Sequence, residues 1–178
     1  MKGKEAAFNA LGKKNYSSTI IHPYNPKAGV FEKVTNEIYK KYYLSQIKSS
    51  FLDFDKTNFG KVATDLYLEA HKALKKNDKT ELMKLFTYPN YELLKLCQRI
   101  KKEPPFTLWP YVDSAKIVHA SINAEQGDSI DINNFAQITL MMLCRDTENS
   151  QKLQYNVFER RLDIKKKNEW KIALIEDY

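Results

Sequence analysis

The sequence predicts an α+β fold in which helices come first, packed on a four-stranded antiparallel curved sheet that follows them. Two observations predict this order. Apolar residues recur with the helical period between residues 30 and 102, and they alternate with a period of two between residues 106 and 178. The connections between the alternating segments are short and rich in turn-forming residues, which favours an antiparallel meander.

Residues 1–29 precede the periodic part of the chain, and we expect them to form an extended basic N-terminal tail. They show no sustained period, and they carry five lysines but a single acidic residue, Glu5. In its shortage of acids this segment resembles a mitochondrial presequence, although it lacks arginine, and it equally suits a basic arm that stays on the mature protein. Residues 30–178 are expected to fold as a single α+β domain.

Two helices are expected at the start of this domain. The first, residues 30–50, has an apolar stripe made of Phe31, Val34, Ile38, Tyr42 and Ile47. The second runs from about residue 58 to residue 76, and its apolar face consists of Val62, Leu66, Ala70, Ala73 and Leu74. Both helices are expected to cover one face of the sheet.

Two shorter helices are expected before residue 102. Asp78 followed three residues later by Glu81 is the pattern of a capping box, which starts a helix by satisfying its first backbone amides. Pro89 stands in the first turn of the next helix, where an amide would have no helical partner in any case. The stretch "KKEPP" ends the helical half of the chain.

Four strands are expected in the second half. Each alternates in hydropathy, and the connections between them are rich in residues that favour turns. The strands span residues 111–125, 135–146, 153–164 and 169–177. No internal repeat or low-complexity block interrupts the pattern, so a single sheet accounts for all four.

The second of these strands is unusual because both of its faces are partly apolar. One face alternates as a half-buried strand requires, through Ala136, Ile138, Leu140, Met142 and Cys144. The other face carries Phe135, Met141 and Leu143 beside two polar residues. We expect these three side chains to be covered by a partner protein, a lipid surface or the chain's own N-terminal segment, unless sheet curvature buries both faces.

The formal net charge of +7 suits a polyanionic partner, either nucleic acid or an anionic membrane surface, although a well-solvated basic surface has the same composition. Two lysine clusters are the candidate phosphate contacts: Lys13 and Lys14 in the tail, and Lys165, Lys166 and Lys167 before the last strand. Exposed lysines at a turn are also ordinary. Tyr16 and Tyr24 in the tail are suited to stacking on unpaired bases.

No motif in the sequence indicates catalysis, a cofactor or a metal. Glycine-rich phosphate loops, a nucleophile elbow and a zinc-binding helix motif are all missing. Cys97 and Cys144 are far apart, and we expect both to be buried apolar residues in a reducing compartment. We therefore expect a protein that is not an enzyme.

One enzymatic alternative stays open at this point. An enzyme built on such a fold would need a carboxylate such as Glu159 in a water-accessible pocket, where burial would raise its pKa. A cross-strand ion pair between Glu159 and Arg145 is the structural alternative. An interior filled by Trp109, Phe158 and Trp170 would exclude the enzyme.

Several stretches resemble one known family when they are taken in order. They are "DLYLEAHKALKKNDKTELMKLFT", "LWPYVDSAKIVHASI", "FAQITLMM", "YNVFERRL" and "EWKIALI". Together they resemble the TIM forty-four-like domain family, a mitochondrial domain that the inner-membrane import-motor anchor shares with a protein of the large ribosomal subunit. The resemblance extends from Phe59 to Ile175, and "FAQIT" with "VFERRL" favours the ribosomal member.

This resemblance implies a cystatin-like cone and a structural role in the mitochondrial large ribosomal subunit, near the polypeptide exit and the inner membrane. The implied partners are mitochondrial rRNA and other large-subunit ribosomal proteins, with peripheral contact to the inner membrane from the matrix side. The alternative is a peripheral inner-membrane module of the import machinery, or an accessory subunit of a respiratory or ATP-synthase complex. Neither role implies a cofactor or a small-molecule substrate.

Overall fold

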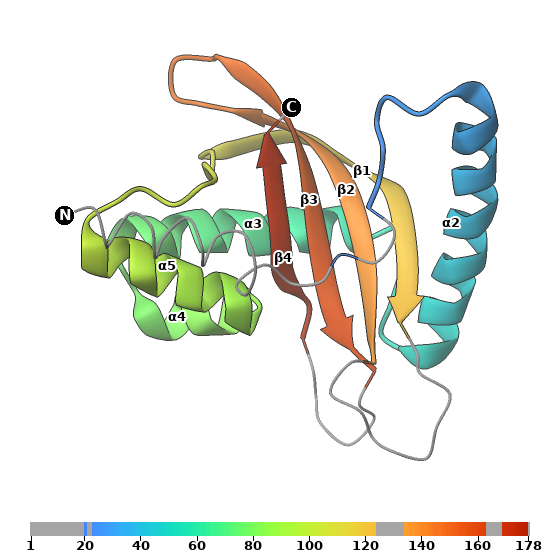
Figure 1. Ribbon diagram of the computed structural model, residues 1–178, viewed down its shortest axis with the longest axis horizontal. Coiled ribbons are helices and arrows are strands. Elements are labelled where there is room, and N and C mark those ends of the chain that lie inside the picture. Colours follow the sequence, from blue (N-terminus) through green and yellow to red (C-terminus); the bar gives the residue numbers. More distant parts are fainter. Residues whose placement is uncertain (1–19, 21–22, 124–133, 163–168, 178) are drawn as a thin grey trace.

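The computed structural model describes residues 20, 23–123, 134–162 and 169–177 (Figure 1). These residues form the helices α2 (Val30–Ser50), α3 (Phe59–Lys76), α4 (Lys79–Leu85) and α5 (Tyr88–Ile100). The strands are β1 (Tyr111–Asn123), β2 (Phe135–Arg145), β3 (Gln151–Arg161) and β4 (Lys171–Asp177). They form one antiparallel sheet in the order β1-β2-β3-β4. The α+β class predicted from the sequence is thereby confirmed.

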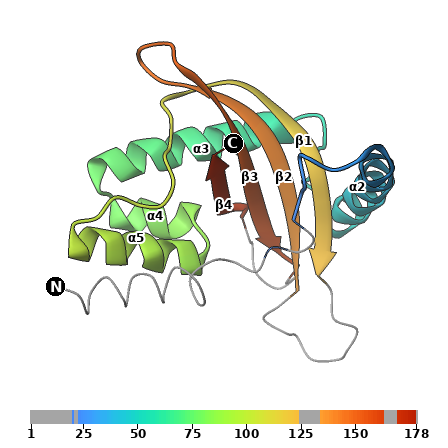
Figure 2. The ribbon, with the colours of Figure 1, turned by 45° about the horizontal axis from the view of Figure 1, so that its top comes forward.

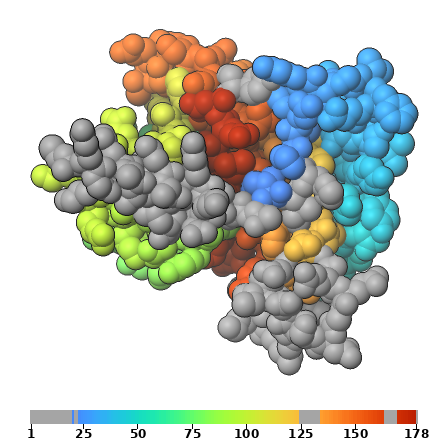
Figure 3. Space-filling view, in the orientation of Figure 1, coloured from blue at the N-terminus to red at the C-terminus, as the bar shows by residue number. Residues whose placement is uncertain are grey.

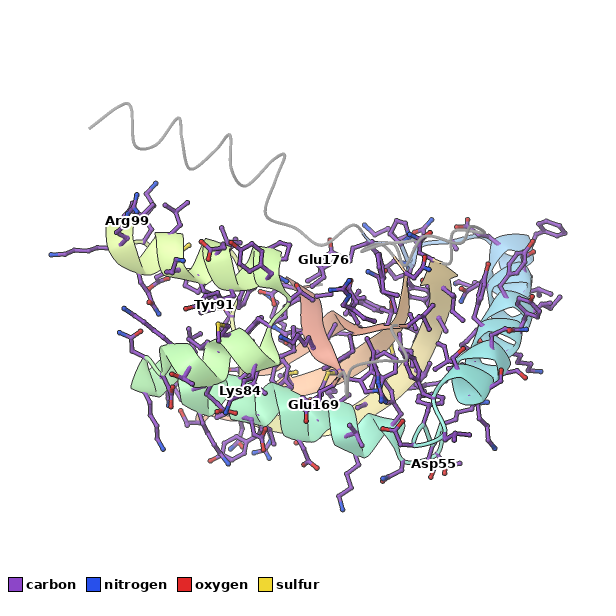
Figure 4. The ribbon with its side chains drawn as sticks, turned by 90° about the horizontal axis from the view of Figure 1, so that it is seen from below. Asp55, Lys84, Tyr91, Arg99, Glu169 and Glu176 are labelled. Atoms are coloured by element: carbon purple, nitrogen blue, oxygen red, sulfur yellow. The ribbon has the colours of Figure 1, made fainter. Side chains whose placement is uncertain are left out.

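The helices do not form one layer on the sheet. α3 lies across one face, α4 and α5 stand beside β4 at one edge, and α2 stands beside β1 at the other edge (Figure 1, Figure 2). Seen from below, α2 lies at the opposite end of the sheet from α4 and α5 (Figure 4). The structure thus differs from the expected arrangement, because α3 covers the face and the other described helices stand at the two edges.

Three of the five buried residues of α3 are alanine, which lets the helix approach the sheet closely. Its buried residues are Phe59, Ala63, Tyr67, Ala70 and Ala73. Ala70 and Ala73 belong to the predicted apolar face, but Val62 is exposed and Ala63 is buried in its place. The backbones come so close that a Cβ atom on Gly60 would lie 3.3 Å from the carbonyl oxygen of Ala115. Close packing therefore favours the smaller side chain at the contact, which a hydropathy pattern does not reveal.

Aromatic side chains fill the space between α3 and the sheet. The ring of Phe59 lies 4.8 Å from the ring of Trp170 and 6.2 Å from that of Phe158, measured between centroids. Phe54 adds a third contact, 6.1 Å from Trp170. The predicted inward side chains of β2 are fully buried, namely Ala136, Ile138, Leu140, Met142 and Cys144. This side of the sheet is therefore a packed core.

A buried polar cluster joins the loop before β1 to α3 and the sheet. The Tyr67 hydroxyl donates to Gln154 Oε1 over 2.6 Å and accepts from the backbone amide of Trp109 over 2.9 Å. Gln154 Nε2 donates to the carbonyl of Thr107 over 2.8 Å and to Asp177 Oδ1 over 2.7 Å. Burial raises the pKa of the Tyr67 hydroxyl well above its usual range, so this group stays protonated and can donate.

Each edge strand contains a β-bulge whose carbonyl binds an asparagine side chain, and β1 has a second register shift between Val112 and Ser114. The register between β1 and β2 shifts at Val118, whose carbonyl accepts from Asn36 Nδ2 of α2 over 2.9 Å. The register between β3 and β4 shifts at Ala173, whose carbonyl accepts from Asn90 Nδ2 of α5 over 2.6 Å. α2 and α5 are thereby attached to opposite edges of the sheet.

Candidate functional site

The sheet face turned away from α3 brings together the three apolar residues singled out from the sequence. Phe135, Met141 and Leu143 all lie on this outer face, and each is half-buried. Gln137 and Thr139 lie between them on the same strand face and are only 2% and 4% exposed. Polar side chains so deeply buried do not face solvent, so other parts of the chain cover the centre of this face.

The segment that leads into α2 is one such cover. The ring of Tyr24 lies 5.4 Å from the ring of Tyr155 and 6.5 Å from that of His119. Tyr155 is the β3 partner of Met141 in the sheet register. Figure 3 shows this segment, in blue, lying over the sheet beside α2. The segment that leads into α2 therefore packs on the part of this face formed by Tyr155 and His119.

This arrangement changes the interpretation of the two tail tyrosines. The Tyr24 ring packs on Tyr155 and is half-buried, so the stacking on a base that the sequence suggested stays a prediction for the exposed part of the ring. Tyr16 lies outside the described residues. Contact of a partner or a membrane with Phe135, Met141 and Leu143 stays a prediction, confined to the part of these side chains that the chain itself leaves exposed.

Asn36 fixes the position of α2 on the edge strand. Its Nδ2 donates to the carbonyl of Val118, and its Oδ1 pairs with Nδ1 of His119. Because Nδ2 is the donor, Oδ1 must accept, so the proton of His119 in this pair is on Nδ1. The two side chains are 83 positions apart in the sequence, and no local motif predicts their pairing.

A cavity of about 630 Å³ opens between the segment 23–28 and α2. Of its twelve lining residues, four carry tyrosine or phenylalanine rings and six carry polar or charged side chains, among them Tyr24, Phe31, Asn36, Tyr39, Tyr43 and His119. Among the described residues that line it, Glu32 is the one carboxylate. The rings of Tyr24, Phe31, Tyr39 and Tyr43 suit an apolar or aromatic group held by packing.

The apolar stripe predicted for the first helix points outward. Of its five residues only Ile47 is buried. The other four have exposed fractions of 86%, 55%, 63% and 57%, in the order Phe31, Val34, Ile38 and Tyr42. We call these four residues the α2 apolar stripe. Phe31 also lines the cavity, so the stripe and the cavity form one continuous surface.

The side of α2 that packs on the sheet includes a lysine. Lys40 is only 9% exposed, and its ammonium group pairs with Glu37 over 2.5 Å. A lysine can bury its aliphatic stem in this way while its charge stays paired. The hydrogen bond from Lys40 lowers the pKa of the Glu37 carboxyl. Hydropathy treats Lys40 as a surface residue, which explains why the sequence pattern placed the wrong side of α2 against the sheet.

The lysines proposed as phosphate contacts lie outside the described residues. They are Lys13, Lys14, Lys165, Lys166 and Lys167, and their role stays a prediction. The described part of the chain also presents exposed lysines on helix surfaces, among them Lys72, Lys75 and Lys76 of α3. Replacing these three lysines removes as much charge as replacing Lys165, Lys166 and Lys167, so they provide a control for the proposed phosphate contacts.

Glu159 does not form the expected ion pair with Arg145. The Arg145 guanidinium instead pairs with Asp113 of β1 over 3.1 Å, and the ion-pair expectation is wrong. Glu159 accepts a hydrogen bond from Gln137 Nε2 over 2.9 Å on the outer face of the sheet. Burial raises the pKa of the Glu159 carboxyl, against the smaller opposing effect of the Gln137 hydrogen bond. It is not among the residues that line the cavity.

We expect Glu159→Gln to stabilise the protein at neutral pH. A carboxyl with a raised pKa in the folded state is destabilising once pH rises through its folded pKa, because its charge is then buried. The glutamine introduced at position 159 carries no charge, and its amide oxygen can still accept the hydrogen bond from Gln137 Nε2. Urea unfolding at pH 7 and pH 4 should show a gain at pH 7 that shrinks at pH 4. The exposed Glu148→Gln should change little, and a gain independent of pH would contradict the assignment.

The described residues offer few groups for other chemistry. Within them, no three His, Cys, Asp or Glu side chains gather closely enough to hold a metal ion. Both cysteines are buried free thiols, and burial raises the pKa of Cys144 to about 11, so this thiol is not a nucleophile at neutral pH. None of the described helices is both long and apolar enough to cross a bilayer.

Comparisons with models of known protein families and with curated proteins find no match to this chain. The resemblance to the TIM forty-four-like family stays a prediction from the sequence. The function proposed below therefore draws on the packed interior, the charge of the chain and the surfaces described above.

Proposed function

We propose that this chain is a structural component of the mitochondrial large ribosomal subunit, near the polypeptide exit, and that it binds rRNA and neighbouring proteins. The observation that carries the proposal is the filled interior. Phe59, Phe158 and Trp170 occupy the space between α3 and the sheet, where an enzyme of this fold would hold its substrate. A basic chain with a packed core is suited to a binding role.

The proposal includes the family and the finer description of the fold. It assigns the chain to the TIM forty-four-like family, as the counterpart of the ribosomal protein L-forty-five. It also takes the sheet as a cystatin-like cone with a basic tail. The bulges at Val118 and Ala173 support the cone, because a bulge bends its strand and increases the local twist.

Two kinds of contact follow from this proposal. Lys13, Lys14, Lys165, Lys166 and Lys167 contact rRNA phosphates, which positions the protein without reading a base sequence. The exposed parts of Phe135, Met141 and Leu143 meet a neighbouring protein or the inner membrane on the matrix side. The net charge of +7 supports the first kind of contact, and the half-burial of the three apolar residues supports the second.

Sedimentation of detergent-solubilised mitochondria through a sucrose gradient tests the proposal. We expect the chain to migrate with the large ribosomal subunit, to be released by nuclease and to dissociate at high salt, because phosphate contacts weaken as salt rises. A chain that stays free at low salt would overturn the proposal. Migration with a membrane complex, unaffected by nuclease, would favour a peripheral module of the import machinery or of a respiratory or ATP-synthase complex.

A matched pair of variants makes this test specific. Replacing Lys165, Lys166 and Lys167 by alanine should release the chain from the large subunit at lower salt than the wild type. Replacing Lys72, Lys75 and Lys76 of α3 by alanine removes the same charge elsewhere and should leave the salt dependence unchanged. Equal effects of the two triple variants would show that only total charge matters and would contradict a contact at residues 165–167.

A further inference from the structure

The α2 apolar stripe is a narrow seam of the kind through which two helices pack. Its residues recur every three or four positions, and Ser45 and Ser49 continue the same line towards the end of α2. The packed side of the helix, with Leu44 and Ile47, is turned away from it. No other labelled element lies on the outer side of α2 in Figure 1 or Figure 2.

The sizes of the side chains along this seam are self-complementary. Ile38 is the midpoint, because Val34 and Tyr42 are each four positions from it and Phe31 and Ser45 are each seven. A second α2 running antiparallel, with a two-fold axis at Ile38, sets Phe31 against Ser45 and Val34 against Tyr42. Large residues then meet smaller ones on both sides of the axis, as packing of side-chain ridges into grooves requires.

The charges beside the seam favour the same arrangement. Glu37 and Lys41 are exposed and lie on one flank of the stripe. Antiparallel helices related by a two-fold axis bring this flank against itself, so Glu37, which also pairs with Lys40 of its own helix, comes within reach of Lys41 of the other copy. A parallel pair would set the same flank against Tyr39 and Gln46, which carry no charge. Opposite charges therefore meet only in the antiparallel pair.

We propose that the α2 apolar stripe binds the same stripe of a second copy of this chain, as an antiparallel helix pair centred on Ile38. The inference concerns the free chain and does not depend on the ribosomal proposal. One helix pair buries less surface than the roughly 1,600 Å² of a typical stable interface, so the dimer is weak and depends on concentration. Sedimentation velocity of the purified chain should show the mass rising from one 20.8 kDa chain towards two over the micromolar range.

Two aspartate variants locate the contact. Ile38→Asp places two carboxylates at the axis and should weaken self-association by roughly 100-fold or more. Leu52→Asp makes an equivalent change at a side chain that is 99% exposed and outside the seam, so it should leave self-association unchanged. A circular dichroism spectrum like that of the wild type confirms that each variant is folded. Equal weakening by both variants would overturn the inference.

Cysteine crosslinking tests the antiparallel register. Under mild oxidation Ile38→Cys should crosslink to itself, because a residue on the axis meets its own copy. Phe31→Cys should crosslink when mixed with Ser45→Cys but not alone, and the native cysteines are buried and do not compete. A Phe31→Cys chain that crosslinks to itself would indicate a parallel pair and overturn the inference.

Self-association and vesicle binding of the wild-type chain show whether a second copy or lipid binds the α2 apolar stripe. A chain that stays monomeric at all concentrations overturns the inference. If that monomer floats with vesicles of anionic phospholipid, and Ile38→Asp does not, lipid and not a second copy occupies the stripe.

Discussion

Replacing Trp170 by alanine is expected to lower the free energy of unfolding by about 3–5 kcal/mol. The indole is only 7% exposed, and its centroid lies 6.0, 6.1 and 4.8 Å from the rings of Phe51, Phe54 and Phe59. These residues come from the connection just before β4, from the connection after α2 and from α3, so no single element can move inward to close the gap. Urea denaturation measures the loss, and the melting temperature should fall by roughly 10 °C.

Two control variants test whether the loss of stability in Trp170→Ala comes from the missing ring. Trp170→Phe keeps a ring in place and should cost less than Trp170→Ala. Leu52→Ala removes a side chain that is 99% exposed and should change stability by no more than about 0.5 kcal/mol. If Trp170→Ala cost as little as Leu52→Ala, the interior would not be packed around the indole, and a substrate-binding chamber would again be open to consideration.

Gln154→Leu is expected to cost about 3 kcal/mol even though leucine is more apolar. Gln154 is fully buried and binds Tyr67, Thr107 and Asp177, and Cys144 Sγ lies 3.4 Å from its Oε1. Leucine can replace none of these bonds, so buried polar groups lose partners. Urea unfolding of Gln154→Leu, Tyr67→Phe and the double variant measures the coupling between the two side chains. A cost of the double variant equal to the sum of the single costs would contradict a shared cluster.

The same substitution should alter the titration of Asp177. Burial by itself would raise the pKa of this carboxyl, but hydrogen bonds from Lys152 and Gln154 outweigh burial and hold the pKa below its usual range. A lowered carboxyl pKa stabilises the fold above its unfolded pKa, and this stabilisation is lost as pH falls through the folded value. In Gln154→Leu the pKa of Asp177 should rise, which an NMR titration of its carboxyl carbon can detect.

Local sequence signals predicted the elements of this fold well. Asp78 accepts a hydrogen bond from the backbone amide of Glu81 over 3.1 Å, as the capping pattern requires. The reciprocal half of the box is not formed, because Glu81 pairs with Lys84 and the Asp78 amide donates to Ala73. Alternation also assigned the inward face of β2 correctly. Each of these signals depends on residues close together in the chain, where spacing fixes geometry.

The candidate site could not be predicted in the same way. Apolar periodicity showed that α2 has a stripe but not whether the stripe faces inward, since Leu44 and Ile47 supply apolar surface on the opposite side. The choice between the sides depends on Asn36, which binds a carbonyl 82 positions away. Likewise, nothing in the sequence around Tyr24 indicates that its ring packs on Tyr155 of β3. Contacts at such separations leave no period in a sequence.

The asparagine contacts at Val118 and Ala173 have a consequence for how the free chain behaves at high concentration. An edge strand with open carbonyls and amides is a template to which the strand of another molecule can add, the first step of aggregation. In β1 the carbonyl of Val118 is occupied by Asn36, and in β4 the carbonyls of Ile172 and Ala173 are occupied by the Thr87 amide and Asn90. Helices α2 and α5 thus act as covers over opposite margins of the sheet, so any association of folded chains must use side-chain surfaces and not strand addition at these positions.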